Sequence, residues 1–308
     1  MRYYSILFGG GTMSKSMLLI VNGSAGTKQA RKGLSDILEI FSKAGYAPIT
    51  KITAKREDAF DLIEQYGKKV EKIVCIGGDG TLNEVTSSMI RTDCHTPLGY
   101  IPAGTTNDFA TTVGISKDIF KAAKEIIEGT PVALDIGCFN DRFFTYVASF
   151  GAFTRASYST PQSSKNMLGH AAYILEGIKE IPDIHPEHLK IVTESDVYQG
   201  DFLIGFISNS TSLGGIITLD SDLVDLKDGK FELVLVKHPK TLIELNETML
   251  AIRMQNYHSP RLIFTTASEA VIYADSEMNW TLDGEFAPGK KVIKIKNKKE
   301  AINYILKK

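Results

Sequence analysis

Residues 73–84 read Ile-Val-Cys-Ile-Gly-Gly-Asp-Gly-Thr-Leu-Asn-Glu. The first four are a short apolar run typical of a buried strand, and a helix is predicted from Leu82 to about Ile90. The turn between them, residues 77–81, follows the carboxyl end of that strand, where open α/β sheets bind ligands. Its glycines let the backbone approach a phosphate closely, and the N-terminus of the following helix supplies N–H groups and partial positive charge. The stretch therefore predicts a phosphate-binding turn in an α/β sheet.

Asp79 is the unusual residue of this turn. A carboxylate beside phosphates is repelled unless a cation lies between them, so Asp79 indicates Mg²⁺. The alternative is a tight turn in which Asp79 only caps the helix. Two more turns favour a phosphate site: residues 104–109 (GTTNDF) again place a glycine, hydroxyls and a carboxylate at a helix start, and residues 22–26 form a third Gly-rich turn. Neither a Walker A lysine pattern nor GxGxxG occurs, so P-loop enzymes and Rossmann dehydrogenases do not fit.

Strands and helices alternate on both sides of this turn. Such alternation over about 120 residues predicts βαβ units and a parallel sheet covered on both faces. The predicted strands are 17–21, 47–53, 73–76 and 98–101, and the predicted helices are 30–41, 58–66, 82–90, 107–113 and 119–127.

The pattern changes near Val132, after which most of the chain reads as strands joined by turns rich in Gly, Asn and Asp. This pattern predicts an antiparallel sandwich. The predicted strands are 132–139, 142–150, 189–193, 201–208, 231–236, 261–266, 270–273 and 292–295, and the predicted helices are 167–181, 242–254 and 301–306.

The composition excludes several classes of protein. The 308 residues are 43% hydrophobic and 23% charged, with a formal net charge of −1, so the chain has a globular composition and no basic signature for nucleic acid. The three cysteines are far apart and odd in number, which argues against a disulfide framework and for a reducing cytosol. The histidines form no zinc pattern, and no apolar run approaches the ~20 residues that span a bilayer. Residues 1–12 are interpreted as an upstream extension, with the natural start at Met13.

Three motifs together resemble the diacylglycerol kinase catalytic family, and within it the soluble bacterial lipid kinases. They are GGDGTLNEV (77–85), IPAGTTNDFA (101–110) and LDGE (282–285). GGDG alone is shared with NAD kinases and phosphofructokinases, but the three motifs in this order are specific, and the similarity covers essentially residues 17–308. The resemblance implies a phosphofructokinase/NAD-kinase-like α/β ATP-binding domain and a β-sandwich lipid-substrate domain, with the active site between them. We place the first domain at 13–131, rejoined by 297–308, and the second at 132–296.

The resemblance also implies a set of ATP contacts and a pair of Mg²⁺ ligands. The carboxylates that organise catalytic Mg²⁺ would be Asp79 and Asp108. One departure from the family is Gly23, which stands where proline is usual in the first loop and would make that loop more flexible. The residues implied to contact ATP are Asn22, Thr53, Gly77, Gly78, Asp79, Gly80, Thr81, Leu82, Asn83, Glu84 and Thr106.

The remaining implied site residues are acidic. Asp283 would be the catalytic base, which accepts the proton of the substrate hydroxyl, and Glu285 would support the site. From the residues alone, Asp283-Gly284 reads as a hairpin turn. Asp135 would join the same acidic network, or be a capping or salt-bridged residue at the domain boundary.

A structural Mg²⁺ is implied in the segment before residue 231. The Asp228 side chain would bind it with the backbone carbonyls of Asp225 and Lys230, although Asp228-Gly229 also reads as a turn. The local match is looser here, because family members often carry Pro and Ala where this chain has Asp222 and Val224.

The resemblance thus implies an ATP- and Mg²⁺-dependent kinase that converts diacylglycerol to phosphatidic acid. Such an enzyme would be cytoplasmic and visit the inner membrane surface, with the lysine-rich run 290–299 or a lip at 158–168 near the lipid; the lysines also read as a solvated face. The alternatives are a kinase of another acceptor, such as another lipid or NAD, and a non-catalytic lipid or nucleotide sensor. A homodimer is kept as an alternative to a monomer.

Overall fold

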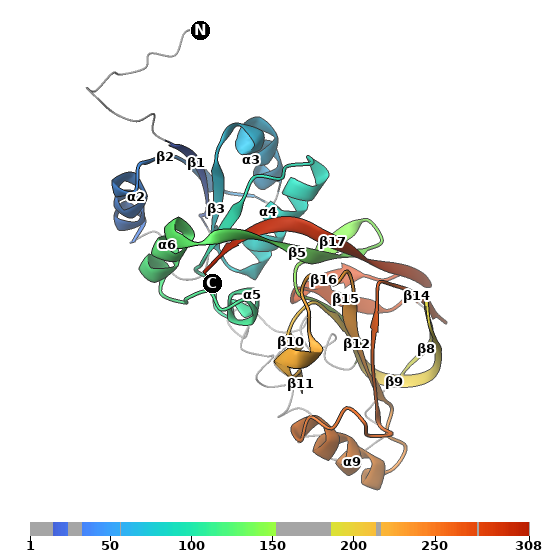
Figure 1. Ribbon diagram of the computed structural model, residues 1–308. Coiled ribbons are helices and arrows are strands. Elements are labelled where there is room, and N and C mark those ends of the chain that lie inside the picture. Colours follow the sequence, from blue (N-terminus) through green and yellow to red (C-terminus); the bar gives the residue numbers. More distant parts are fainter. Residues whose placement is uncertain are drawn as a thin grey trace, which may run out of the picture.

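The computed structural model describes residues 15–23, 33–55, 57–151, 186–213, 217–275 and 277–307. Several sequence predictions fall outside these ranges: the extension at 1–12, the helix at 167–181 and the lip at 158–168. The described residues form two parts, an α/β part and a strand-rich part (Figure 1).

Four parallel strands form the sheet of the α/β part, in the order β2-β1-β3-β4. Every strand predicted for this part is present, as is the part of each predicted helix that lies in the described residues. The elements are β1 (Lys15–Asn22), α2 (Leu34–Lys43), β2 (Tyr46–Thr53), α3 (Asp58–Tyr66), the 3₁₀ turn η1 (Gly67–Lys69), β3 (Lys72–Gly77), α4 (Asp79–Arg91), β4 (Leu98–Pro102), α5 (Asp108–Thr112) and α6 (Ile119–Glu128).

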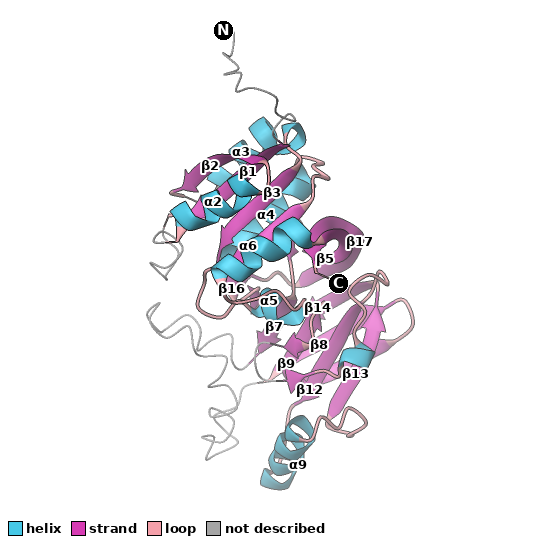
Figure 2. Ribbon diagram, turned by 60° about the vertical axis from the view of Figure 1, so that its left-hand side comes forward, coloured by secondary structure: helices cyan, strands magenta, loops and turns pink. Residues whose placement is uncertain are grey.

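Helices cover both faces of this sheet. Successive side chains of a strand point to opposite faces, and in β1 Met17 and Leu19 pack with α2 and α6 while Leu18 and Ile20 pack with α3 and α4. The apolar run of β1 is therefore explained by burial on both sides, as expected for a parallel sheet. Figure 2 shows α2 and α6 on the near side of the strands.

The strand-rich part is antiparallel. The long strand β9 pairs with β8 along its first half and with β7 and β12 along its second half, which links the strands into a curved structure. The elements are β5 (Thr130–Phe139), β6 (Arg142–Phe144), β7 (Val147–Gly151), β8 (Glu187–Thr193), β9 (Val197–Ser208), β10 (Ser212–Leu213), β11 (Ile217–Thr218), the 3₁₀ turn η4 (Ser221–Leu223), β12 (Phe231–Lys237), α9 (Leu242–Arg253), β13 (Leu262–Ala267), β14 (Glu269–Ala274), β15 (Asn279–Leu282), β16 (Glu285–Pro288) and β17 (Val292–Leu306).

The predicted helix at 301–306 is wrong, because this segment is the end of β17. Ile302 and Tyr304 alternate into the core, and Tyr304 lies opposite Val132 of β5 and Leu98 of β4. Short apolar runs do not distinguish a strand from a helix by themselves. Here the segment is a strand because it pairs with β5 and β4. This pairing joins the two parts and supports our proposal that residues 297–308 rejoin the α/β domain.

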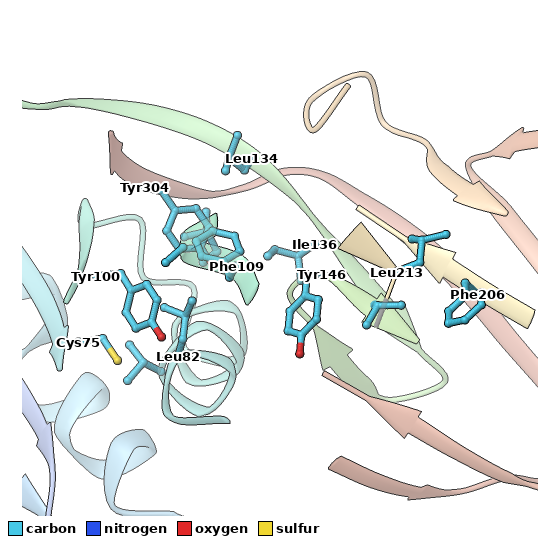
Figure 3. Packing of buried hydrophobic residues seen from close by; sticks show 14 of the residues in the cluster. Cys75, Leu82, Tyr100, Phe109, Leu134, Ile136, Tyr146, Phe206, Leu213 and Tyr304 are labelled. Atoms are coloured by element: carbon cyan, nitrogen blue, oxygen red, sulfur yellow. The ribbon is translucent and has the colours of Figure 1, made fainter. Parts of the chain in front are cut away.

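One buried cluster runs through both parts. Figure 3 shows it extending from Cys75 and Tyr100 in the α/β part, past Tyr304 and Ile136, to Phe206 in the strand-rich part. A second cluster around Trp280 fills the strand-rich part alone. The predicted fold class, α/β followed by an antiparallel β domain, is confirmed.

Candidate active site

The turns that follow β3 and β4 touch each other through glycines. The Gly77 carbonyl accepts a hydrogen bond of 2.7 Å from the Ala103 N–H. A Cβ on Gly104 would lie 2.5 Å from the Cα of Gly78, a distance that atoms do not tolerate. Glycine at position 104 is therefore needed because two backbones meet there, and the two predicted phosphate turns form one continuous surface.

Asp79 joins these two turns. It is the first residue of α4, yet its carboxylate does not cap that helix. Instead it accepts from the backbone N–H groups of Asp108, at 3.1 Å, and Phe109, at 3.3 Å, at the start of α5. The alternative in which Asp79 only caps its own helix is therefore wrong, because the carboxylate binds the start of α5 instead. Burial, followed by the neighbouring Asp108 carboxylate, raises the pKa of Asp79 to about 6.

Two asparagines hold the turns in shape. Asn107 has a positive φ of 54°, and its side chain accepts from the Gly104 N–H at 3.0 Å and donates to the Gly104 carbonyl at 3.0 Å. Asn22, at the end of β1, donates to the Thr81 hydroxyl at 2.7 Å. The end of β1 is therefore linked to the turn after β3 at one edge of the parallel sheet, while residues 24–26 of the third predicted turn lie outside the described residues.

Asp283 lies in a two-residue hairpin turn between β15 and β16, as the residues alone predict. Leu282 pairs with Glu285, and both Asp283 and Gly284 have positive φ, as a type I′ turn requires. The turn faces α4: Asp283 accepts from the Asn83 side chain at 2.7 Å, and a Cβ on Gly80 would lie 2.7 Å from a Glu285 oxygen. LDGE is thereby brought to the GGDGT turn.

The Asp283 carboxylate accepts five hydrogen bonds. Besides Asn83, the donors are the Thr145 N–H (2.6 Å) and hydroxyl (2.8 Å), the Tyr146 N–H (3.0 Å) and the Val147 N–H (3.1 Å). This explains why the single strand predicted at 142–150 is divided into β6 and β7, since the N–H groups between them bind a carboxylate instead of a neighbouring strand. Burial raises the pKa of Asp283, and these hydrogen bonds oppose that rise.

A cavity of about 250 Å³ opens beside this arrangement. Gly80, Asn83 and Glu84 line it from α4, Asp283 and Glu285 from the hairpin, and further residues from α3 and β6 complete it. The site therefore lies between the α/β part and the strand-rich part. Its lining holds several carboxylates beside Gly80 of the first glycine turn, an arrangement suited to phosphate and cation rather than to an apolar ligand alone.

Some predicted site residues lie elsewhere. The side chain of Leu82 is buried in the core, so only its backbone can face a ligand. The Thr53 hydroxyl donates to the Val21 carbonyl at 3.5 Å, and Thr106 is half-buried on the second turn. Asp135 accepts from the N–H groups of Gly229 and Glu300, both at 2.7 Å, which is the capping role left open above.

A family model described as the diacylglycerol kinase catalytic domain matches residues 16–139. Over 274 residues the chain is 32% identical to a diacylglycerol kinase of Bacillus subtilis (strain 168), covering 88% of this chain and 90% of that protein. The chain belongs to the diacylglycerol kinase family. A diacylglycerol kinase of Staphylococcus aureus (strain MRSA252) is 34% identical over 276 residues, covering 89% of this chain and 87% of that protein.

The fold of this diacylglycerol kinase family member is also found among solved structures. A protein of Bacillus anthracis str. Sterne described as a diacylglycerol kinase superposes with a TM-score of 0.74 at 22% identity, covering 96% of this chain and 98% of that one. A second structure from that organism gives a TM-score of 0.80 at 24% identity, covering 98% and 99% of the two chains. Both similarities concern the fold.

The acidic pair of this family member fits a cation. Asp108 has a buried carboxylate oxygen, Oδ2, without a hydrogen-bond partner among the described residues, and burial raises its pKa. No three acidic, histidine or cysteine side chains in the described ranges form a metal cluster. Mg²⁺ is commonly held by one or two carboxylates together with phosphates and water. Asp79 and Asp108 would therefore hold it jointly with the nucleotide.

The fit is weaker at the second predicted Mg²⁺ site. The Asp228 side chain accepts from the Lys230 N–H at 2.8 Å, and the Lys230 carbonyl accepts from the Asn297 side chain at 2.7 Å, so both are engaged within the protein. Nearby, Glu232 is 2% exposed and its Oε2 has no partner among the described residues. The site stays a proposal, in which Asp228 and the carbonyls of Asp225 and Lys230 hold the ion.

Glu232 predicts a dependence of stability on pH. Burial, followed by repulsion from Asp228, Asp225 and Asp135, raises its pKa to about 8. The folded protein therefore binds a proton that the unfolded chain releases, so stability is full below about pH 4.5 and falls as pH rises toward 8. Between pH 5 and pH 8 we expect the original protein to lose about 1–3 kcal/mol of its free energy of unfolding through Glu232. The variant Glu232→Gln should not show this loss. Urea unfolding at several pH values in EDTA would measure the free energy of unfolding of both proteins. An equal dependence on pH in both would contradict the prediction.

Tyr146 is a site residue that sequence reasoning missed, since one tyrosine in a predicted strand carries no motif. It is 2% exposed, and a hydrogen bond from its hydroxyl opposes the rise that burial causes in the pKa of Asp108. Asp79 and Asp283 also act on this hydroxyl, so it lies among the acidic residues of the site. Its backbone N–H binds Asp283.

We expect Tyr146→Phe to lower kcat/KM for phosphoryl transfer by about tenfold, because a hydrogen bond to a charged group is removed while the ring is kept. The fold should be retained, since the backbone contact to Asp283 does not change. Affinity for Mn²⁺ with a non-hydrolysable ATP analogue, read by electron paramagnetic resonance, should weaken in parallel. Unchanged activity and unchanged Mn²⁺ affinity would show that the hydroxyl only fills space.

Proposed function

We propose that this protein is an ATP-dependent kinase that phosphorylates the hydroxyl of diacylglycerol to give phosphatidic acid. One observation carries the proposal: Asp79 binds the start of α5 while Asn83 and Gly80 contact the Asp283–Glu285 turn, so three motifs that are distant in sequence meet at the start of α4. The relatives named diacylglycerol kinase support the choice of acceptor.

The nucleotide phosphates would lie on the glycine turns. The N–H groups at the start of α4, with no side-chain cap, point toward that position and favour an anion. The remaining predicted ATP contacts, Asn22, Thr53, Thr106 and Glu84, stay proposals. Mg²⁺, held by Asp79 and Asp108, would neutralise charge on the phosphates and orient the terminal one.

The proton acceptor is better placed at Glu285 than at Asp283. A general base needs a lone pair directed at the substrate hydroxyl, and Asp283 already accepts five hydrogen bonds from its own protein. Glu285 lines the same cavity and lies against Gly80, next to the predicted phosphate position. We therefore propose that Glu285 accepts the proton and that Asp283 holds α4, β7 and the hairpin together. Asp135, bound to Gly229 and Glu300, would act on the site only through the fold.

A lipid panel tests the proposed function. The purified protein is incubated with labelled ATP and Mg²⁺ and with diacylglycerol, phosphatidylglycerol, a sphingoid base or a polyprenol in mixed micelles, and with NAD. Label in diacylglycerol would support the proposal. If label appeared only in another lipid or only in NAD, that compound would be the acceptor in place of diacylglycerol. Nucleotide binding without label in any acceptor would favour a sensor.

A lipid acceptor implies peripheral contact with a membrane, and we propose the cytoplasmic surface of the inner membrane as the place of action. In the described part of the chain no helix is long and apolar enough to cross a bilayer. The lysine-rich run 290–299 lies largely on β17, where Lys296 pairs with Glu269 at 2.8 Å. A homodimer stays a proposal that size-exclusion chromatography with light scattering would test.

A further inference from the structure

Helix α9 exposes large apolar side chains. Ile243 is 71% exposed, Met254 69%, Leu242 58% and Leu250 57%. Ile243, Leu250 and Met254 are seven and eleven residues apart, which places them on one side of the helix, while Leu245, Thr248 and Ala251 are buried on the other side. We call Ile243, Leu250 and Met254 the α9 apolar face. Several large apolar side chains exposed together on one helix indicate an interaction surface for a protein or a membrane.

Three cations and two carboxylates lie on and beside α9. Both acidic residues of the helix are paired with one arginine: Arg261 lies 3.0 Å from Glu244 and 3.3 Å from Glu247. The cations Lys240 and Arg253 flank the helix at its two ends, and neither forms an ion pair with another described residue. Apolar side chains with a cation at each end of the helix complement an anionic lipid surface, which offers acyl chains beneath negative headgroups.

The position of α9 fits this role. The helix follows β12 at the end of the strand-rich part that lies farthest from α2 and β2 in both views (Figures 1 and 2). It therefore projects from the molecule without involving the residues that line the candidate active site. A helix in this place can lie in the interface of a bilayer while the α/β part stays in water.

We propose that the α9 apolar face, with Lys240 and Arg253, is the surface by which this protein docks on anionic membranes. The inference rests on the proposed lipid substrate, because a kinase of an insoluble alcohol has to reach a bilayer. Vesicle binding should require α9 whether or not the lipid is phosphorylated, so it can be measured without kinase activity.

The test is co-sedimentation of the full chain with large vesicles of phosphatidylcholine containing about a third phosphatidylglycerol, without ATP. The variant Ile243→Asp/Leu250→Asp should bind roughly tenfold or more weakly than the original protein, since two apolar side chains lose their burial. Lys240→Glu/Arg253→Glu should lose binding to these vesicles and the dependence of that binding on salt. The matched control is Val197→Asp, which changes an apolar residue that is 58% exposed.

Val197 is a fair control because it lies at the other end of the strand-rich part. Its hairpin contacts Ser268 through Glu194, near the start of β12, whereas α9 follows the end of β12. Val197→Asp should bind vesicles like the original protein. All variants should phosphorylate a short-chain, water-soluble diacylglycerol equally well. Lack of activity in the original protein would contradict the proposed function alone, since sedimentation is measured separately.

Three outcomes would overturn the docking proposal. The first is vesicle binding by Ile243→Asp/Leu250→Asp that equals the original, which would point to another surface such as the lysine-rich run 290–299. The second is no vesicle binding by the original protein. The third is a dimer in light scattering that the α9 variant dissociates, because the face would then bind a second copy of this chain.

Discussion

Replacement of Glu285 by Gln is expected to lower kcat by about 10²–10⁴-fold, because the glutamine cannot accept the proton of the attacking hydroxyl. The change keeps the size and shape of a side chain that lies against Gly80 and lines the cavity. Affinity for ATP should change little, since the predicted phosphate contacts are made by the glycine turns and the start of α4. The fold should also be kept, since Glu285 is only half-buried in the hairpin.

Rates with diacylglycerol micelles and equilibrium binding of a fluorescent ATP analogue would separate these two effects. Glu57→Gln is the matched control, since Glu57 lines the same cavity from the start of α3. The control should keep most of the activity. A Glu285→Gln protein with more than about a tenth of the original kcat would remove Glu285 as the proton acceptor.

Much of the α/β part was predictable from sequence because local and global requirements agree there. The run at 73–76 is buried on both faces, its glycine turn is needed for the contact with Gly104, and the helix after it begins at Asp79. The hairpin at Asp283-Gly284 was predictable for the same reason, since only a few residues tolerate positive φ twice in succession.

Other features were not predictable because contacts distant in sequence decide them. Residues 301–306 became a strand through pairing with β5, and the break at Thr145 and Tyr146 exists because the carboxylate of Asp283 binds there. Asp135 could not be assigned from its motif either, because its partners Gly229 and Glu300 are far along the chain. The place of Tyr146 among the site carboxylates depends on the same break in the strand.

Asp283→Asn is expected to destabilise the protein by about 2–4 kcal/mol, because the amide group brings a donor to a position where three backbone N–H groups need acceptors. The N–H groups of Thr145, Tyr146 and Val147 are buried with this side chain, which is 6% exposed. One oxygen of asparagine cannot replace both carboxylate oxygens, so at least one N–H loses its partner. The loss should appear as a lower urea midpoint with an unchanged m-value.

The same substitution distinguishes the two roles open to Asp283. If it organises the site, activity and stability should fall together, and low temperature or saturating nucleotide should restore part of the activity. If it is the base, Asp283→Asn should be as stable as the original and inactive at every temperature. Asp141→Asn, in the exposed turn between β5 and β6, is the matched control for stability. Because five donors converge on Asp283 and its backbone holds a positive φ, we expect the first result.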